Sequence, residues 1–292
     1  MREIHYMELG GTLFIPASHK NLQAIVNEKK LSGLKSVVID FEDGLDKEAF
    51  VEAMQNFCKV AQNITSHSPF VFVRARGLAH LKELLEVDAT MKIDGFVLAK
   101  FSLLNAEEYF KLLAKTNYYI MPSIEGEELF NHNKLHFLKE KIIANRERIL
   151  LVRFGLEDML RQLEMRRKCN ESIFDFSSTS AVIGNFIATF KSSGFGISGG
   201  VYPCYKDEEG FIKDVQRDLK EGLFTKTIIH PNQIELLNKL YRVPKEVYTE
   251  AKEIKVSKKV LFSQNQKMAE VVTMLPFSIN LILRAKIYGK VD

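Results

Sequence analysis

The sequence predicts an α/β protein folded as a (β/α)8 TIM barrel with a C-terminal helical extension. Short apolar runs alternate with helical periodicities, and eight such units follow one another over about 240 of the 292 residues. A single barrel of this kind commonly takes about 250 residues. The competing fold, an open doubly wound sheet, usually carries a glycine-rich phosphate turn after its first strand. The turn here reads Pro16-Ala17-Ser18, which favours the barrel.

The expected strands are short apolar runs rich in Val, Ile, Leu and Phe. They cover 13–15, 37–40, 70–73, 95–98, 118–124, 149–152, 196–202 and 227–229. Pro122 is an unfavourable residue for a central strand because it has no N–H group to donate. The glycines of 196–202 make the seventh strand the weakest of the set.

Apolar residues at helical spacing predict helices between most of these strands. The clearest segments are 22–26, 50–61, 211–219 and 234–241, and 169–190 is interpreted as an additional helix between units six and seven. Pro231 stands where helices favour proline, at the first position. We therefore expect a catalytic barrel domain over 1–242. A helical extension over 243–292 would pack on the barrel or on a neighbouring subunit.

Composition excludes several classes of protein. With 21 Phe, 9 Tyr and a net charge of only +4, the chain has enough to bury and is not disordered. Because no block of Lys and Arg stands apart from acidic neighbours, we expect no nucleic-acid binding. The apolar run 271–283 is short and contains Pro276 and Asn280, so no membrane span is expected. The N-terminus lacks the apolar core of a signal peptide.

The cysteines are Cys58, Cys169 and Cys204, which lie far apart and form no CxxC pair. We therefore expect neither a disulfide framework nor a structural zinc site, and we expect a soluble protein of the reducing cytoplasm.

Charged and polar residues gather where the predicted strands end. They are Asp40, Glu42 and Asp43 after the second strand, Arg74 and Arg76 after the third, Lys100 after the fourth, Glu125 after the fifth, Asp158 after the sixth and His230 after the eighth. Barrel enzymes place their sites at this carboxyl face. The alternative is that charges simply begin where a buried strand stops, and six strand ends of this kind make that alternative weaker for the set.

Glu125 and Asp158 come from neighbouring strands, which lie roughly 4.8 Å apart. Two carboxylates there can share one Mg²⁺ ion, with water and substrate oxygens completing the octahedron. Alternatively, both acids stabilise helix N-termini.

Arg74 is expected to point into the barrel mouth, where its guanidinium can hold a carboxylate through two parallel hydrogen bonds. The alternative is an ion pair with Asp40 or Glu42. Those two acids share one face of a strand, and we favour a supporting role for them over acid–base chemistry. His19 follows the first strand and faces either a phosphate or solvent, and His230 is expected to cap a helix.

Ordered segments of the chain resemble the citrate lyase beta-subunit group of the HpcH/HpaI aldolase superfamily of C–C bond lyases. They are Leu13-Phe14-Ile15-Pro16, Val38-Ile39-Asp40-Phe41-Glu42-Asp43, Val73-Arg74, Gly95-Phe96-Val97-Leu98-Ala99-Lys100, Pro122-Ser123-Ile124-Glu125, Phe154-Gly155-Leu156-Glu157-Asp158-Met159, Gly200-Val201-Tyr202-Pro203 with 207–210, and Ile229-His230-Pro231-Asn232-Gln233. Their order and spacing together make the signal fairly specific.

The resemblance implies a TIM barrel assembled as a trimer or hexamer. It implies Mg²⁺-dependent cleavage or formation of carbon–carbon bonds in β-hydroxy acids, often as CoA thioesters. Glu125 and Asp158 match the metal carboxylates and Arg74 matches the arginine that binds the substrate's acid group. Pro122 matches the proline that precedes the metal glutamate.

The chain departs from the family pattern at three places. His19 stands where relatives carry an arginine associated with CoA or phosphate, and Leu98-Ala99-Lys100 replaces Leu-Pro-Lys. The tail segment 271–276 lacks the aspartate of many CoA-using relatives. These departures weaken the expectation of CoA chemistry and fit a divergent branch found near stress or tellurite-resistance genes.

We therefore expect a Mg²⁺-dependent C–C lyase acting on a β-hydroxy acid, a keto acid or its CoA thioester. The expected catalytic residues are Arg74, Asp43, Glu42 and Asp40, the metal ligands Glu125 and Asp158, and the substrate-binding residues Arg74, Lys100, His19 and His230. The base stays open between Asp43, a water on the metal and a substrate phosphate. The alternative function is a catalytically altered barrel that serves as a binding or assembly subunit.

Overall fold

The computed structural model describes residues 2–42, 45–46, 48–258, 260–264 and 267–292. Asp43, one of the expected catalytic residues, lies outside them. By its internal contacts the chain divides into two compact units, Met1–Glu235 and Leu236–Asp292. The domain boundary expected at 242/243 stays a prediction.

The first unit is built on a curled parallel sheet of seven strands. Its strands are β1 (Gly11–Pro16), β2 (Ser36–Asp40), β3 (Phe70–Arg74), β4 (Gly95–Leu98), β5 (Tyr119–Ile124), β6 (Arg153–Phe154) and β7 (Lys226–Ile228). Their spatial order is β6-β5-β4-β3-β2-β1-β7, so successive strands are neighbours. This is the arrangement of the predicted TIM barrel.

The gap between β6 and β7 is closed by the segment 197–199. Ile197 forms a parallel bridge to Val152, and Gly199 forms one to Lys226. The Gly199 N–H donates to the Thr225 carbonyl at 2.8 Å. The weak seventh strand predicted over 196–202 is therefore present only as isolated bridges. Its glycines weaken strand pairing, which explains why the bridges do not extend into a ladder.

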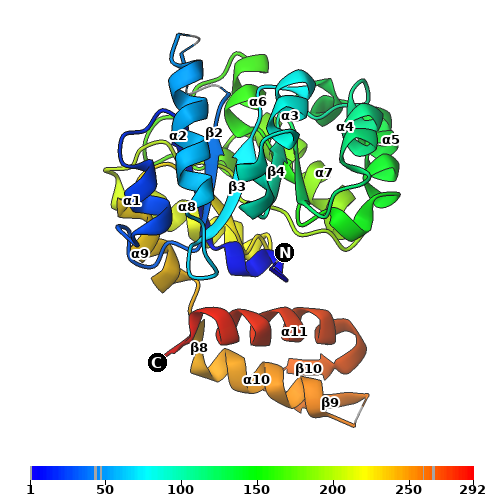
Figure 1. Cartoon of the computed structure of the whole chain (residues 1–292). Coiled ribbons are helices and arrows are strands. Elements are labelled where there is room, and N and C mark those ends of the chain that lie inside the picture. The colour runs from blue at the N-terminus through cyan, green and yellow to red at the C-terminus, as the bar shows by residue number, and fades with distance from the viewer. Residues whose placement is uncertain (1, 43–44, 47, 259, 265–266) are drawn as a thin grey trace. The chain divides into compact units, whose positions relative to one another are not determined.

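Helices surround these strands (Figure 1). In the first unit they are α1 (Leu22–Asn27), α2 (Phe50–Gln62), α3 (Leu78–Leu85), α4 (Ala106–Leu113), α5 (His132–Ile143), α6 (Leu156–Gln162), α7 (Ser177–Lys191) and α8 (Glu208–Lys220). Helix α9 (Asn232–Leu240) contains the division between the units. Short 3-10 turns occur at Tyr6–Leu9, Asp88–Lys92, Glu127–Phe130, Arg146–Arg148 and Ile173–Asp175.

The barrel interior is apolar below and charged at its mouth. Val38, Phe72 and Met121 pack into one buried cluster from β2, β3 and β5. Side chains alternate along a strand, so the residues two positions further on share the inward face. Those residues are Asp40, Arg74 and Ser123, and all three line a cavity at the carboxyl ends of the strands.

Two predicted elements differ in detail from the structure. The sixth strand was expected over 149–152, whereas β6 begins at Arg153, because Ile149 and Val152 make only single bridges. The additional helix was expected from Cys169, but α7 begins at Ser177. Residues 169–176 instead form turns that bring Cys169 to the segment near Cys204.

Cys169 and Cys204 form a disulfide, with their Cα atoms 5.8 Å apart. This bond corrects the expectation that the cysteines form no disulfide framework. The pair was missed because 35 residues separate the two positions and no CxxC motif marks them. Only Cys58 is free among the cysteines.

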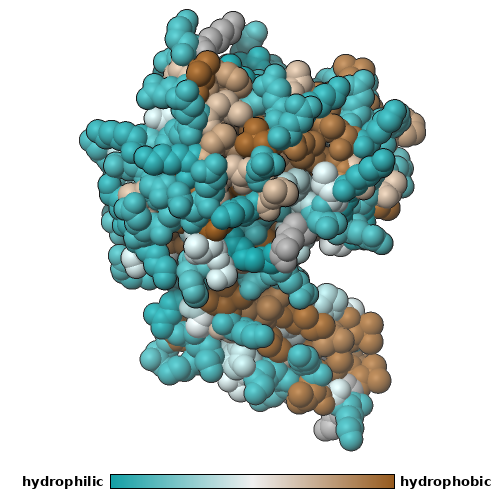
Figure 2. Space-filling view, viewed as in Figure 1, coloured by the Kyte–Doolittle hydropathy of each residue, from teal (hydrophilic) through white to brown (hydrophobic). Residues whose placement is uncertain are grey.

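After α9, the described residues of the second unit form a helical pair and a small hairpin. Its elements are β8 (Val243–Pro244), α10 (Lys245–Val256), β9 (Leu261–Gln264), β10 (Lys267–Glu270), α11 (Val271–Tyr288) and β11 (Lys290–Val291). Helices α10 and α11 share a small core of Val243, Ala251, Leu281 and Ala285. Figure 2 shows apolar side chains gathered over α11.

Helix α11 is longer than the apolar run that predicted it. It has 18 residues and a mean hydropathy of 1.3, so by length and composition it is the one candidate for a membrane span in the described part of the chain. The apolar run 271–283, which was expected to be too short to cross a membrane, is thus part of a longer helix. A single helix of this kind is weak evidence for a membrane span. One face of α11 packs against α10 through Leu281 and Ala285.

Candidate active site

A cavity of about 620 Å³ opens at the carboxyl ends of the barrel strands. Its walls include Phe14 from β1, Thr227 from β7 and the apolar side chain of Val97. The charged residues that line it are Asp40, Arg74, Glu125, Arg153, Glu157 and Asp158. Four predicted site residues, Asp40, Arg74, Glu125 and Asp158, thus meet in one cavity.

Arg74 is held by two carboxylates. Its Nε and Nη2 donate to Asp40 at 2.7 and 2.6 Å, and its Nη1 lies 3.0 Å from Glu42 Oε2. Lys100 Nζ lies 2.7 Å from the other Glu42 oxygen. The structure therefore contains the ion pairs with Asp40 and Glu42 that the sequence offered as an alternative. They fix the orientation of a guanidinium that is mostly buried at the cavity wall.

Glu125 follows β5 and is 5% exposed. The pKa of its carboxyl is raised to about 7, chiefly by burial and also by the charges of Glu42 and Asp158, against the lowering effect of a hydrogen bond with Ser123 and of the charge of Arg74. Gly155 makes room for this side chain. A Cβ atom at Gly155 would lie 2.2 Å from Glu125 Cγ, so any larger residue would displace the carboxylate.

Asp158 lies in the first turn of α6, where its Oδ1 accepts a hydrogen bond from Arg161 at 2.7 Å. Gln162 Nε2 donates to the carbonyls of Glu125 and Asp158 at 2.5 and 3.1 Å, so one side chain ties the two backbone segments together.

The pair suits a divalent cation. A buried carboxyl whose pKa is raised by neighbouring carboxylates is stabilised in its charged form by a cation between them. The described residues contain no group of three or more His, Cys, Asp or Glu arranged for a metal. Two carboxylates with oxygen ligands from water and substrate are nevertheless a usual Mg²⁺ set.

The other predicted binding residues do not line the cavity in the described structure. His19 Nδ1 accepts from the Asn21 N–H at 3.2 Å, and burial lowers the pKa of the His19 imidazole, as do Lys20 and Lys30. His230 Nδ1 accepts from the Asn232 N–H at 3.2 Å, so it caps α9 as expected. Lys100 contacts the site through its ion pair with Glu42 and through its backbone N–H, which donates to Glu125 Oε2 at 3.3 Å.

Arg153 is a cavity residue that the sequence analysis missed. It was placed just beyond the predicted sixth strand, whereas it begins β6 and is 3% exposed. Burial and the charge of Arg74 lower the pKa of its guanidinium to about 9, so it stays cationic at neutral pH. A signal was present: Leu-Val-Arg at 151–153 repeats the pattern of Phe-Val-Arg at 72–74, an arginine closing an apolar strand.

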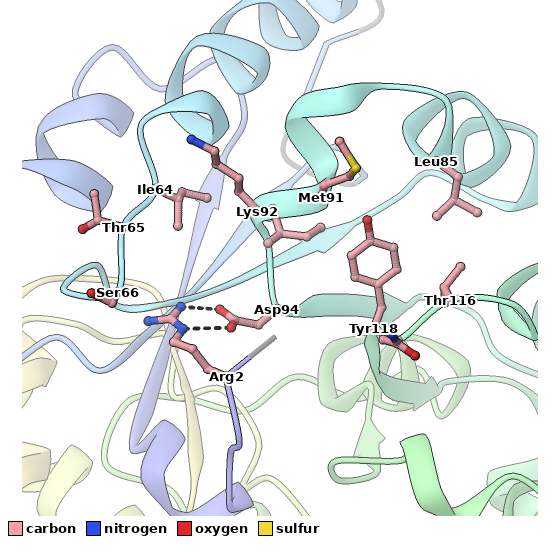
Figure 3. Close-up of a pocket in the computed structure, with 12 residues that line it drawn as sticks. Arg2, Ile64, Thr65, Ser66, Leu85, Met91, Lys92, Asp94, Thr116 and Tyr118 are labelled. Carbon is pink, nitrogen blue, oxygen red and sulfur yellow. Dashed lines mark hydrogen bonds and ion pairs between the residues drawn. The ribbon is translucent and has the colours of Figure 1, made fainter.

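A second cavity, of about 790 Å³, lies at the amino ends of the strands (Figure 3). Its arginine, Arg2, faces Asp94 and donates from Nε to Oδ1 at 2.9 Å. Arg2 also donates to the carbonyls of Ser68 and Pro69. Because these bonds engage the guanidinium and this face of a barrel commonly serves stability, we place the candidate site at the other end.

Comparison with known proteins agrees with the barrel fold. The model of the family described as C–C bond lyase of the TIM-barrel fold matches residues 3–290. A curated relative, the (3S)-malyl-CoA thioesterase of Cereibacter sphaeroides, is 24% identical over 78% of this chain and 75% of its own length.

Three solved structures share the fold. The CitE protein of Mycobacterium tuberculosis, in complex with magnesium, acetoacetate and coenzyme A, superposes with a TM-score of 0.71 at 18% identity, over 96% of this chain and 99% of that one. RipC of Yersinia pestis gives 0.62 at 17% identity, over 82% and 98%. The citrate lyase beta subunit of M. tuberculosis, with oxaloacetate and magnesium, gives 0.61 at 18% identity, over 82% and 100%. The chain belongs to the C–C bond lyase family of the TIM-barrel fold.

Proposed function

We propose that this chain is a Mg²⁺-dependent lyase that cleaves or forms a carbon–carbon bond in a small hydroxy or keto acid or its CoA thioester. The observation that carries the proposal is the meeting of Glu125, Asp158 and Arg74 in one cavity. Structures of fold neighbours that contain magnesium with acetoacetate or oxaloacetate support it.

Glu125 and Asp158 would hold the ion, which supplies a Lewis acid that stabilises negative charge on a substrate oxygen. Arg74 donates hydrogen bonds to the substrate carboxylate, and Asp40 and Glu42 keep its guanidinium in place. Phe14, Val97 and Leu156 supply the apolar wall that limits water in the cavity. Asp43 stays the protein's candidate for the base that takes the hydroxyl proton.

Thioester hydrolysis is a second candidate, because the curated relatives are named (3S)-malyl-CoA thioesterases. The two reactions differ in their products. Carbon–carbon cleavage gives two carbon fragments, whereas hydrolysis gives free CoA and the intact acid.

The proposal is tested by substituting each metal carboxylate. Glu125→Ala and Asp158→Ala should each abolish Mg²⁺ binding in titration calorimetry and reduce turnover by at least about 100-fold, with circular dichroism unchanged. Glu140→Ala, at an exposed carboxylate on α5, is the matched control and should leave both intact. Full activity in both site variants would refute the lyase, and a protein that binds acids without turnover would favour a binding subunit.

We also propose a cytoplasmic homo-oligomer, a trimer or hexamer, that binds small carboxylic acids and no nucleic acid. The family resemblance and the absence of a basic block in the sequence support this. Light scattering of the eluting protein measures the oligomeric state directly.

A further inference from the structure

Arg153 places a buried positive charge at the cavity. Its Nη1 donates to Thr227 Oγ1 at 2.9 Å and to Ser198 Oγ at 3.3 Å. Its Nε and Nη2 are buried and have no hydrogen-bond partner among the described residues. Within that part of the structure no carboxylate forms an ion pair with Arg153. A buried cation in this state is costly unless an anion reaches it.

The open atoms form one edge of the guanidinium. Arg74 uses the same edge, Nε with Nη2, to hold both oxygens of Asp40. Two parallel N–H donors match the two oxygens of a carboxylate, and the resulting pair is stronger and more directional than a single contact. The group that best matches the two unpaired donors of Arg153 is therefore a carboxylate.

Three of the acids that line the cavity and its other arginine already have roles. Asp40 is paired with Arg74, and Glu125 and Asp158 form the pair that suits a cation. Arg74 and Arg153 flank a common neighbour, since their Cζ atoms lie 5.3 and 5.2 Å from the centroid of the Phe14 ring. Two guanidinium groups therefore lie near the Phe14 ring, at different places on the cavity wall.

We propose that Arg153 binds a second carboxylate of the substrate, so that the site selects a free dicarboxylic hydroxy or keto acid. A thioester at that position is neutral and would leave the buried guanidinium unpaired. The inference rests on the proposed function only in assigning the first carboxylate to Arg74 and the metal.

The test compares two acids that differ in one group. Malate carries a carboxylate where 2-hydroxybutyrate carries a methyl group. Calorimetry of the full chain, with and without Mg²⁺, should give malate a Kd at least about tenfold lower, as a hydrogen-bonded charge pair typically provides. Arg153→Met should bring the two dissociation constants within about threefold of each other, with 2-hydroxybutyrate binding little changed.

Two further variants keep the test decisive. Arg153→Lys retains the charge but not the paired donors and should give an intermediate ratio, which also serves if the methionine variant fails to fold. Arg148→Met removes one positive charge at Arg146–Arg148, where Arg148 donates to the Leu113 and Thr116 carbonyls, and should leave the ratio unchanged. A ratio unaltered by both Arg153 variants, or wild-type protein that binds the acids equally or not at all, overturns the inference.

The two proposals fail separately. Loss of malate preference in Arg153→Met without any Mg²⁺ binding or turnover would support the dicarboxylate site and refute the lyase. Turnover by the wild-type protein, with a malate preference that Arg153→Met leaves unchanged, would support the lyase and refute the dicarboxylate site.

Discussion

At the scale of single residues, the cavity holds two buried ionisable groups that the fold compensates only in part. Glu125 is pushed toward its neutral form by burial and by neighbouring acids. Arg153 keeps its charge but has an edge without a partner in the described structure. Neither arrangement stabilises the empty protein, because burying unpaired charge costs free energy. In the proposed complex, a cation at Glu125 and an anion at Arg153 would relieve both costs.

Mg²⁺ binding should depend on pH through Glu125. Its pKa of about 7 means that the carboxyl is largely protonated below that pH, and the cation must displace the proton. We expect Mg²⁺ affinity to fall by up to about tenfold per pH unit below 7, with close to one proton released per ion at pH 6. Calorimetry in two buffers of different ionisation enthalpy measures the proton count. Equal affinity at pH 5.5 and 8 would contradict this.

The stability of the metal-free protein should change in the opposite sense. The ordinary pKa of 4.5 applies in the unfolded chain, so the folded protein holds the proton more tightly. Stability is therefore lost as pH rises from about 4.5 to about 7, by up to about 3 kcal/mol. Glu125→Gln cannot lose that proton and should flatten this part of the profile in urea unfolding measured against wild type.

At the scale of elements, the turn from β6 into α6 concentrates the site. Within six residues it carries Arg153, Gly155 and Asp158. The turn is possible because Gly155 has no side chain where Glu125 passes from β5. A short strand followed at once by a helix thus brings these three residues to the carboxyl edge of the barrel.

Gly155→Ala should disrupt this turn. The new Cβ would lie 2.2 Å from Glu125 Cγ, so we expect a loss of about 1–3 kcal/mol of stability together with weaker Mg²⁺ binding. Gly184→Ala is the matched control, because Gly184 lies within α7 with nothing within 4 Å of the added Cβ. That variant should gain up to about 1 kcal/mol. Thermal unfolding and metal titration of both variants decide the matter, and equal behaviour would refute a close approach.

The sequence could predict those parts of the site that sit at the ends of long apolar strands. Arg74 closes an uninterrupted apolar run and Glu125 follows the largely apolar run 119–124, so their places at the barrel mouth were expected from periodicity. Arg153 was missed because β6 has only two residues and its apolar run begins earlier, in residues that make single bridges. The ion pairs that orient Arg74 depend on which strands lie side by side. The sequence pattern alone does not decide this, so it offered those ion pairs only as an alternative.

At the scale of the whole molecule, a covalent link and several hydrogen bonds join segments that are distant in the chain. Arg167 Nη2 donates to the Val201 carbonyl at 2.7 Å, and the Asn170 N–H donates to Tyr202 Oη at 2.8 Å. The disulfide between Cys169 and Cys204 closes the same junction. Because Val201 and Pro203 line the cavity, this junction supports one of its walls.

The sequence could not anticipate the link. Spacing along the chain carries no information about a pair separated by 35 residues unless the fold is already known. If the cysteines stay reduced, as expected in the cytoplasm, the purified chain has three free thiols; if the disulfide forms, it has one. Counting thiols separates the two cases.

Denatured without reductant, air-purified protein should titrate one thiol, Cys58, and after reduction it should titrate three.

Closing a loop of this length is typically worth about 2–4 kcal/mol, so the Cys169→Ser/Cys204→Ser double variant should be less stable than oxidised wild type by that amount and equal to reduced wild type. Cys58→Ser, which removes the same group elsewhere, should change stability little. Because the link supports the cavity wall, the double variant should also bind malate more weakly. Three titratable thiols in the untreated protein, or a double variant as stable as the oxidised chain, would show that the hydrogen bonds of Arg167 and Asn170 hold this wall without the covalent bond.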